Sequence, residues 1–217
     1  MTRSPLYAIL DTEVAAAFGW TVPDLARACC DGGARLFQVR AKALASGAFL
    51  TLVDEVVRIA RPYGAEVIVN DRADLARMAG AAGVHVGQED LDPSSVRRIV
   101  GPDAIVGLST HTIEQIAGAR REPITYLAVG PVFRTTSKDT GYEPVGLPFV
   151  TEAARSRLGH GGAGSERIPV VAIGGITLDR APTVLSAGAS SVAVISDLFA
   201  GGRPEFRVRE YLVSLGG

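Results

Sequence analysis

The sequence predicts an α/β protein, a (β/α)8 TIM barrel formed as a single domain by residues 1–217. Two observations lead to this expectation. Eight short apolar runs rich in β-branched residues recur along the chain, and stretches with apolar residues at helical spacing separate them. Parallel strands need helical crossovers that cover both faces of the sheet, and eight such units fit a chain of this length. An open, doubly wound sheet is the alternative arrangement of the same elements.

The strand-like runs and the helical stretches can be placed in order. The runs are LYAIL at residue 6, LFQVR at 36, EVIVN at 66, GVHVG at 83, AIVGL at 104, ITYLAVG at 124, PVVAIGG at 169 and SVAVIS at 191. Helical spacing marks residues 22–30, 50–60, 74–81, 95–100, 113–120, 148–158, 178–188 and 205–215. Residues 159–166, GHGGAGSE, combine glycines with no apolar period and predict a loop, in which His160 would be solvated.

Composition narrows the class of protein. With 47% hydrophobic and 21% charged residues, the chain can bury a large core. It has no apolar run of membrane-spanning length, and MTRSPLYAIL lacks the apolar stretch of a signal peptide, so we expect a cytoplasmic protein without a membrane partner. A net charge of -1 with both signs interspersed predicts no nucleic-acid partner. Cys29 and Cys30 are adjacent on a helical stretch and are expected to be small buried fillers. No feature indicates an oligomeric state.

Polar residues follow almost every predicted strand, at the end where a barrel of this type carries its chemistry. They are Gln38, Arg40 and Lys42 for the second strand, Asn70 and Asp71 for the third, Gln88, Glu89 and Asp90 for the fourth, Ser109, Thr110 and His111 for the fifth, Thr135, Thr136, Ser137 and Lys138 for the sixth, Gly174 and Gly175 for the seventh and Ser196 for the eighth. Because the carboxyl-terminal ends of parallel strands meet at one end of the barrel, we expect these residues to gather there.

Two carboxylates in this set predict a cation site. Asp71 and Asp90 end neighbouring strands, about 5 Å apart in the hydrogen-bonding direction, so they can converge on one ion. Carboxylates that leave room for water and phosphate oxygens suit Mg²⁺ better than zinc. The alternatives are structural: Asp71 would cap the following helix or pair with Arg72, and Asp90 would cap the helix after it, for which Asp92 is better placed.

Cations and glycines in the same set predict binding of an anion. Arg40, Lys42 and Lys138 would place positive charge opposite a polyanion, unless they are solvated surface residues. The stretches 174–177 (GGIT) and 195–197 (ISD) follow the seventh and eighth strands, where barrels of this type hold phosphate on backbone N–H groups.

The two histidines near these strand ends carry different expectations. His85 lies in the middle of the fourth strand and is expected to be a packed core residue rather than a ligand. His111 lies beside Ser109 at the end of a strand, where a role in the site and a structural role are about equally supported.

Seven stretches resemble, in order, the motifs of the thiamine phosphate synthase family: QVRAK, VND, AGVHVGQEDL, GLSTHT, VGPVFRTTSK, VVAIGGIT and VAVIS. The resemblance spans about residues 6–198, and GVHVGQED is its most specific part. It implies a transferase of thiamine biosynthesis with two small-molecule substrates and Mg²⁺ as cofactor. The family joins 4-amino-2-methyl-5-hydroxymethylpyrimidine diphosphate to 4-methyl-5-(2-phosphooxyethyl)thiazole, giving thiamine phosphate and pyrophosphate.

The resemblance also implies roles for individual residues. Gln38 matches a residue near the pyrimidine; Arg40, Lys42, Asn70 and Lys138 match the pyrophosphate-binding group; Asp71 and Asp90 match the magnesium ligands; Ser109 matches a serine beside the reacting carbon; Thr135, Ser137, Gly175, Ile195 and Ser196 match positions around the thiazole phosphate. Ser109, Lys138 and Arg40 are the expected catalytic residues. Three positions depart from the family pattern: Ala41 replaces an acidic residue, Arg134 a proline and Ser137 a threonine.

The implied reaction is dissociative, because pyrophosphate leaves before the thiazole nitrogen attacks. Stabilising the leaving group therefore matters most, and no strong general base is required. Two other functions fit the same barrel. A thiazole tautomerase would keep the thiazole phosphate site without needing pyrophosphate or metal, and a non-catalytic barrel could bind a phosphorylated metabolite and regulate a partner.

Overall fold

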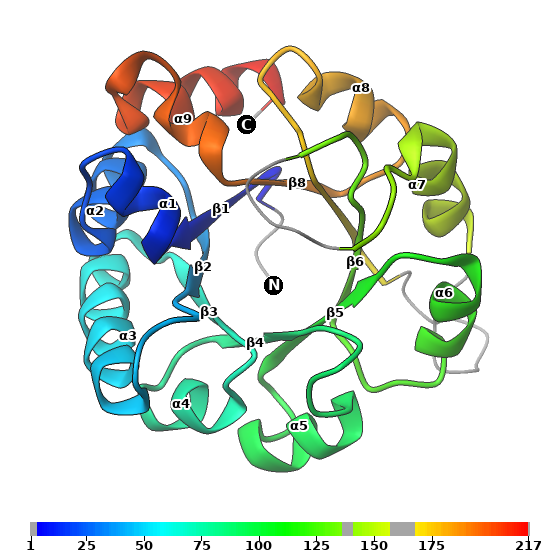
Figure 1. Ribbon diagram of the computed structural model, residues 1–217, viewed down its shortest axis with the longest axis horizontal. Coiled ribbons are helices and arrows are strands. Elements are labelled where there is room, and N and C mark those ends of the chain that lie inside the picture. Colours follow the sequence, from blue (N-terminus) through cyan, green and yellow to red (C-terminus); the bar gives the residue numbers. More distant parts are fainter. Residues whose placement is uncertain (1–3, 136–140, 157–167, 217) are drawn as a thin grey trace.

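All eight strand-like runs form strands, and the strands pair in parallel to close a barrel in the order β1 to β8 (Figure 1). The computed structural model describes residues 4–135, 141–156 and 168–216. The strands are β1 (Leu6–Asp11), β2 (Leu36–Arg40), β3 (Glu66–Asn70), β4 (Gly83–Val86), β5 (Ile105–Thr110), β6 (Tyr126–Val129), β7 (Val170–Ile173) and β8 (Ser191–Val194). The predicted (β/α)8 barrel is confirmed, and the open sheet is wrong because β8 pairs with β1.

Helices form an outer ring around the barrel and follow the strands in sequence order (Figure 1). They are α1 (Thr12–Ala17), α2 (Val22–Gly32), α3 (Ser46–Ala60), α4 (Ala73–Met78), α5 (Pro93–Val100), α6 (Ile113–Ala119), α7 (Gly146–Arg155), α8 (Ala181–Ser186) and α9 (Pro204–Ser214), with 3-10 turns η1 (Arg61–Tyr63) and η2 (Ser196–Gly202). Each predicted helical stretch overlaps one of these helices. The sequence pattern does not predict α1 or η2, because such short segments carry too little periodicity.

Local sequence sets where the helices begin and end. The side chain of Thr21 accepts a hydrogen bond from the backbone N–H of Asp24 at the start of α2, and Asp92 accepts one from Ser95 at the start of α5. Each of these helices has a proline in its first turn, where a missing N–H costs nothing. Gly33 caps the C-terminus of α2, and its φ of 105° favours glycine. These signals fix the loops that connect the helices to the strand ends.

The first and last long helices pack together and complete the ring. Cys29 and Cys30 lie on α2, both are free and buried, and burial raises the pKa of both thiols, that of Cys30 to about 11. On the same helix, a Cβ added to Gly32 would lie 2.8 Å from Cβ of Val208 on α9, so the two helices approach closely. The cysteines are therefore inert packing residues, as predicted.

Side chains inside the barrel form a second core, separate from the layer between strands and helices. Its largest members, Tyr7 and Tyr126, are fully buried and meet edge to face, with ring centroids 6.0 Å apart. Gly107 lies between His85 and Tyr126 in the strand register, and a side chain there would collide with the Tyr126 ring. The missing side chain lets residues of β4 and β6 touch across β5.

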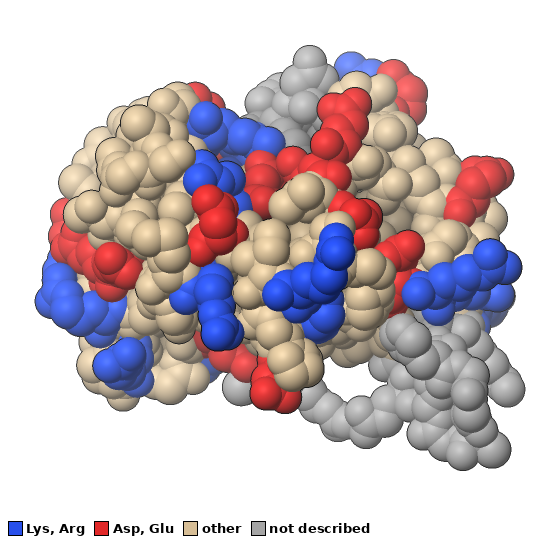
Figure 2. All heavy atoms as spheres, turned by 90° about the horizontal axis from the view of Figure 1, so that it is seen from below, with Lys and Arg blue, Asp and Glu red and all other residues tan. Residues whose placement is uncertain are grey.

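The surface carries both charge signs. On the face shown in Figure 2, Lys and Arg groups alternate with Asp and Glu groups, and neither sign forms a continuous band. Among the residues described, no helix has the length and apolar character needed to span a membrane.

Candidate active site

A cavity of about 310 Å³ lies at the carboxyl-terminal end of the barrel, and all eight strands contribute to its lining. The predicted site residues that line it are Gln38, Arg40, Asn70, Ser109, Thr135, Gly175, Ile195 and Ser196. Lys42, Asp71 and Asp90 are not among the lining residues. Ser137 and Lys138 lie outside the residues that the structure describes. We call the expectation that polar residues after the strands gather at one end of the barrel the strand-end rule. Most of the residues predicted by this rule line one cavity, while the carboxylates of Asp71 and Asp90 lie apart from its walls.

Arg40 forms a buried ion pair with Asp11, the residue opposite it in the β1–β2 register. The Arg40 side chain is only 14% exposed, so the interpretation as a solvated surface cation is wrong for this residue. The other carboxylate oxygen of Asp11 accepts from the backbone N–H groups of Glu13 and Val14 and caps α1. Within the described part of the chain, Nε of Arg40 is buried without a hydrogen-bond partner. The ion pair with Asp11 and the cavity thus place the guanidinium at the wall of the site with one donor unsatisfied.

Asp71 has an unusual backbone and a cationic partner. Its φ is +62°, the single non-glycine residue with positive φ among those described. Its backbone N–H donates to the carbonyl of His85, and its carboxylate lies 2.5 Å from Nζ of Lys42. The structural alternatives are wrong, because Arg72 pairs with Asp74 and no side chain caps α4. A strained backbone that aims a carboxylate at a cation is typical of a functional position.

The GQED segment folds back on itself after β4. One carboxylate oxygen of Asp90 accepts from the backbone N–H of Gly87 at 2.7 Å, and the side-chain amide of Gln88 donates to the carbonyl of Ser109 at 2.6 Å. Asp90 does not cap α5, since Asp92 does. The first bond closes the turn, and the second holds the segment against the end of β5.

Five polar side chains form a continuous chain through the barrel interior. Nε2 of Gln38 donates to the hydroxyl of Tyr7 at 3.0 Å, and that hydroxyl lies 3.1 Å from the hydroxyl of Tyr126. The Tyr126 hydroxyl lies 2.8 Å from Nδ1 of His85, and Nε2 of His85 lies 2.8 Å from Oγ of Ser109. Burial raises the pKa of both phenols, so they stay protonated. We call these five residues the hydrogen-bond chain.

The hydrogen-bond chain changes the interpretation of His85. The residue is buried, as predicted for a core histidine, but it also lines the cavity and contacts a predicted site residue, Ser109. The two tyrosines, Tyr7 and Tyr126, were not predicted. Their place in the apolar runs LYAIL and ITYLAVG indicates burial and says nothing about which polar groups they meet.

His111 also lines the cavity, but its ring contacts are structural. Its Nδ1 is hydrogen-bonded to the carbonyl of Gly130, and its ring stacks on Tyr142 with centroids 4.0 Å apart. Its backbone N–H donates to the side chain of Gln115 in α6. The residue thus links the end of β5 to the loop after β6.

The turn after β7 requires glycine at two positions, because the loop after β6 packs directly against its backbone. Gly174 and Gly175 have φ values of +104° and +62°. An added Cβ at Gly174 would lie 2.6 Å from Cα of Pro131, and one at Gly175 would lie 2.9 Å from Cβ of Phe133. With Ile195 and Ser196, which begin η2 after β8, these glycines form what we call the glycine site, where backbone N–H groups can hold an anion.

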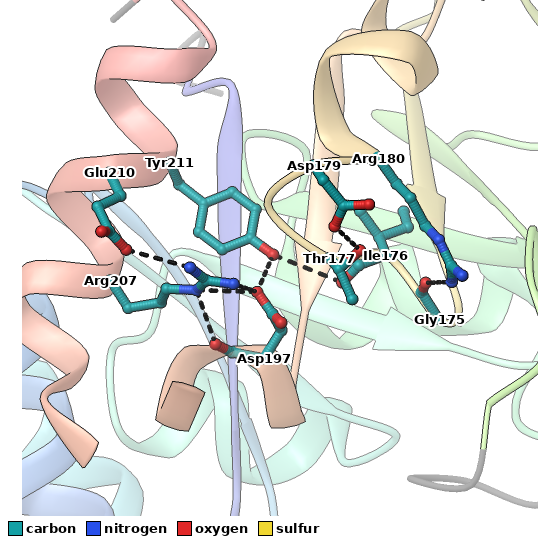
Figure 3. A network of polar contacts seen from close by, with 9 residues as sticks. All are labelled: Gly175, Ile176, Thr177, Asp179, Arg180, Asp197, Arg207, Glu210 and Tyr211. Atoms are coloured by element: carbon teal, nitrogen blue, oxygen red, sulfur yellow. Dashed lines mark hydrogen bonds and ion pairs between the residues drawn. The ribbon is translucent and has the colours of Figure 1, made fainter. Parts of the chain in front are cut away.

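A network of ion pairs and hydrogen bonds lies beside the glycine site and includes Asp197, which also lines the cavity (Figure 3). Asp197, directly after Ser196, accepts at Oδ2 from Nε and Nη2 of Arg207 and, at 2.6 Å, from the hydroxyl of Tyr211. Burial and the bond to Asp197 raise the pKa of Tyr211, so the phenol remains a donor. Helix α9 therefore anchors the segment after β8 through a neutralised carboxylate.

The fold and this cavity indicate the class of enzyme. A (β/α)8 barrel with glycine turns after the seventh strand and a short helical turn after the eighth is typical of barrel enzymes that bind phosphorylated substrates.

Comparison with known proteins identifies the family. The model of the family described as thiamine monophosphate synthase matches residues 6–198, and the chain belongs to this family. Thiamine-phosphate synthase of Roseiflexus castenholzii is 40% identical over 95% of this chain and 86% of its own length, and that of Koribacter versatilis is 41% identical over 95% and 93%. The solved structure of thiamine phosphate pyrophosphorylase from Pyrococcus furiosus superposes with a TM-score of 0.85 at 28% identity, covering 99% of this chain and 96% of that one. The resemblance inferred from the sequence, and the transferase function that it implies, are confirmed.

Proposed function

We propose that the chain joins 4-amino-2-methyl-5-hydroxymethylpyrimidine diphosphate to 4-methyl-5-(2-phosphooxyethyl)thiazole and releases pyrophosphate. The observation that carries the proposal is the division of one cavity into two sides. Gln38 and Ser109 line it from β2 and β5, and the glycine site lines it from β7 and β8. A cavity of this kind can hold an aminopyrimidine on one side and a phosphorylated thiazole on the other. We also predict that the protein is cytoplasmic, consists of a single domain and has no nucleic-acid partner.

The residues at the exits of β3 and β4 fit a magnesium ion. In the described residues, Asp71 and Asp90 each use a single carboxylate oxygen, Oδ2, for a protein contact. Asp71 already binds a cationic group, the Lys42 ammonium, which is half exposed and can move away. No cluster of three or more His, Cys, Asp or Glu gathers in the described chain, so water and phosphate oxygens would complete the coordination. We call Asp71 and Asp90 the carboxylate site.

Mg²⁺ held by the carboxylate site would neutralise charge on the leaving pyrophosphate. The protein's own residues would do the rest. Arg40, which lines the cavity and is kept in place by Asp11, can set its guanidinium charge beside a phosphate group, and Lys42, once displaced from Asp71, can contribute a point charge. Asn70 and Lys138 would bind the same group. Ser109 would donate to the developing anion, and each such preplaced contact is worth about 3 to 4 kcal/mol in the transition state.

Product identification tests the proposal. The protein is incubated with both substrates and Mg²⁺, and thiamine phosphate and pyrophosphate are quantified together. We expect equal amounts of both products, and loss of both in EDTA. Consumption of a thiazole isomer without pyrophosphate release would point to a tautomerase, and binding of a phosphorylated substrate without turnover would point to a regulatory barrel. Either result would overturn the proposal.

A further inference from the structure

With Nε2 of Gln38 facing Tyr7, the hydrogen-bond chain gives both tyrosine hydroxyl hydrogens an acceptor in only one direction. The hydrogen-bond chain consists of four hydrogen bonds, and each bond needs one hydrogen. Nε2 of Gln38 has no lone pair to offer, so it donates to Tyr7. Tyr7 then donates to Tyr126, Tyr126 donates to Nδ1 of His85, and Nε2–H of a neutral His85 donates to Ser109. Every bond then has one donor and one acceptor.

The opposite direction leaves one buried donor unsatisfied. If Ser109 donated to His85, the imidazole hydrogen would move to Nδ1 and point at Tyr126, and Tyr126 would donate to Tyr7. Tyr7 would then accept from both Tyr126 and Gln38, and its own hydroxyl hydrogen would have no acceptor within the hydrogen-bond chain. Because Tyr7 is 1% exposed, an unpaired hydroxyl hydrogen there is costly.

We propose that Gln38 sets the direction of the hydrogen-bond chain, so that Tyr7, Tyr126 and His85 act as positioning residues that leave the Ser109 hydroxyl hydrogen for the substrate. Because Oγ of Ser109 accepts from His85, its own hydrogen is free to donate to an anionic oxygen. In the opposite direction Ser109 would offer that oxygen only lone pairs. The choice of pyrophosphate as this anion rests on the proposed function, whereas the direction of the chain does not.

The tautomer of His85 reports the direction without any activity measurement. Imidazole ¹⁵N spectra are recorded at about pH 8, above the ordinary pKa of histidine, about 6.5. The protein has three histidines, and the His85 signals are assigned by their loss in the His85→Asn variant. We expect the hydrogen on Nε2 in the wild type and on Nδ1 in Gln38→Glu, because a carboxylate accepts from Tyr7 and reverses the chain.

His111 is the internal control for the spectra. Its Nδ1 faces the carbonyl of Gly130, which can only accept, so its hydrogen stays on Nδ1 in both proteins. A wild-type His85 with its hydrogen on Nδ1 would overturn the proposal. A tautomer that does not change in Gln38→Glu would also overturn it.

A double-mutant cycle tests whether the chain acts through Ser109. Tyr126→Phe breaks the chain without touching the cavity wall. Ser109→Ala is expected to slow turnover at least about a hundredfold and Tyr126→Phe about tenfold, and the double variant no more than about twofold below the poorer single one. Tyr63→Phe is the matched control, because it removes an exposed phenol that donates to Asp31 at 2.7 Å, and it should leave turnover near wild type.

The outcomes separate this proposal from the proposed function. If the penalties of Ser109→Ala and Tyr126→Phe multiply, the two residues act independently and the positioning role is wrong. If Tyr126→Phe does not fold, the tautomer spectra decide. If the wild type makes no thiamine phosphate, the proposed function fails, and the direction of the chain still stands or falls on the spectra.

Discussion

The glycine site and the carboxylate site both follow strand ends of the barrel, but they are held in different ways. At the glycine site, backbone N–H groups are the proposed binding elements, and neighbouring backbone leaves no space for a side chain at Gly175. Asp197 next to it is fixed by Arg207 and Tyr211. At the carboxylate site, Asp71 is paired with a lysine whose side chain is 50% exposed.

This difference indicates how each site would contribute to binding and turnover. A site made of fixed backbone groups is ready before the ligand arrives and loses little freedom on binding. In our proposal the carboxylate site would exchange Lys42 for a metal ion, so it would be completed only together with its ligand. We therefore expect changes at the glycine site to affect binding of the phosphorylated thiazole, and changes at the carboxylate site to affect turnover.

The largest effect is expected at the carboxylate site. Asp71→Asn or Asp90→Asn keeps the size of the side chain but removes the charge that would retain the proposed metal ion. Pyrophosphate release at saturating substrate should fall at least about a hundredfold, or about 2.7 kcal/mol. The double variant should be scarcely worse than the poorer single one, since both residues act on one ion. Binding of the phosphorylated thiazole, followed by calorimetry, should survive.

Asp74→Asn is the matched control for this prediction. Asp74 lies near Asp71 in the chain but is exposed and paired with Arg72, so the variant should turn over at nearly the wild-type rate. Wild-type rates in Asp71→Asn and Asp90→Asn, or full activity in EDTA, would show that these carboxylates are structural.

Gly175→Ala should produce the next largest effect. Its φ is +62°, and the new Cβ would press on Phe133 and the Arg134 carbonyl, so the turn must move. Calorimetry should show binding of the phosphorylated thiazole weakened about 30-fold, or about 2 kcal/mol. Gly80→Ala has the same φ of +62° with no atom within 4 Å, and it should cost only backbone strain of about 1 kcal/mol in unfolding free energy. Equal binding losses in both variants would contradict the role of close approach.

A smaller effect is expected beside the glycine site. Tyr211→Phe removes a hydroxyl that donates to Asp197 at 2.6 Å, which frees the carboxylate to shift toward the neighbouring anion site. The KM for the phosphorylated thiazole should rise about tenfold, equivalent to about 1.4 kcal/mol, while kcat stays near wild type. Tyr63→Phe removes a comparable bond to Asp31 away from the cavity and should leave this KM unchanged. A fall in kcat with no change in KM would argue against the anchoring role.

Arg134→Ala should have the smallest effect. The residue replaces the proline of the family pattern, and its side chain is exposed and does not line the cavity. Catalytic efficiency should change by less than about tenfold, or about 1.4 kcal/mol. A loss of a hundredfold or more would show that Arg134 reaches a substrate.

Much of the architecture could be predicted because it depends on local pattern. The runs LFQVR and EVIVN coincide with β2 and β3 residue for residue, since five consecutive residues suffice to show a buried strand. The strand-end rule likewise placed Gln38 and Ser109 at one cavity before any contact was known. The same rule applied to the first strand would have found Asp11, which directly follows the apolar run LYAIL.

By itself, the sequence determined the order of the strands, the end of the barrel that is polar and the family to which the chain belongs. Each follows from which residue types occur, and in what order along the chain. Only the tertiary structure decided the partners. Arg40 pairs with Asp11 because the β1–β2 register sets them opposite each other, and His85 reaches Tyr126 because Gly107 between them has no side chain. Closing the barrel brings residues from distant parts of the chain into contact, and the hydrogen-bond direction at Ser109 depends on those contacts rather than on any local pattern.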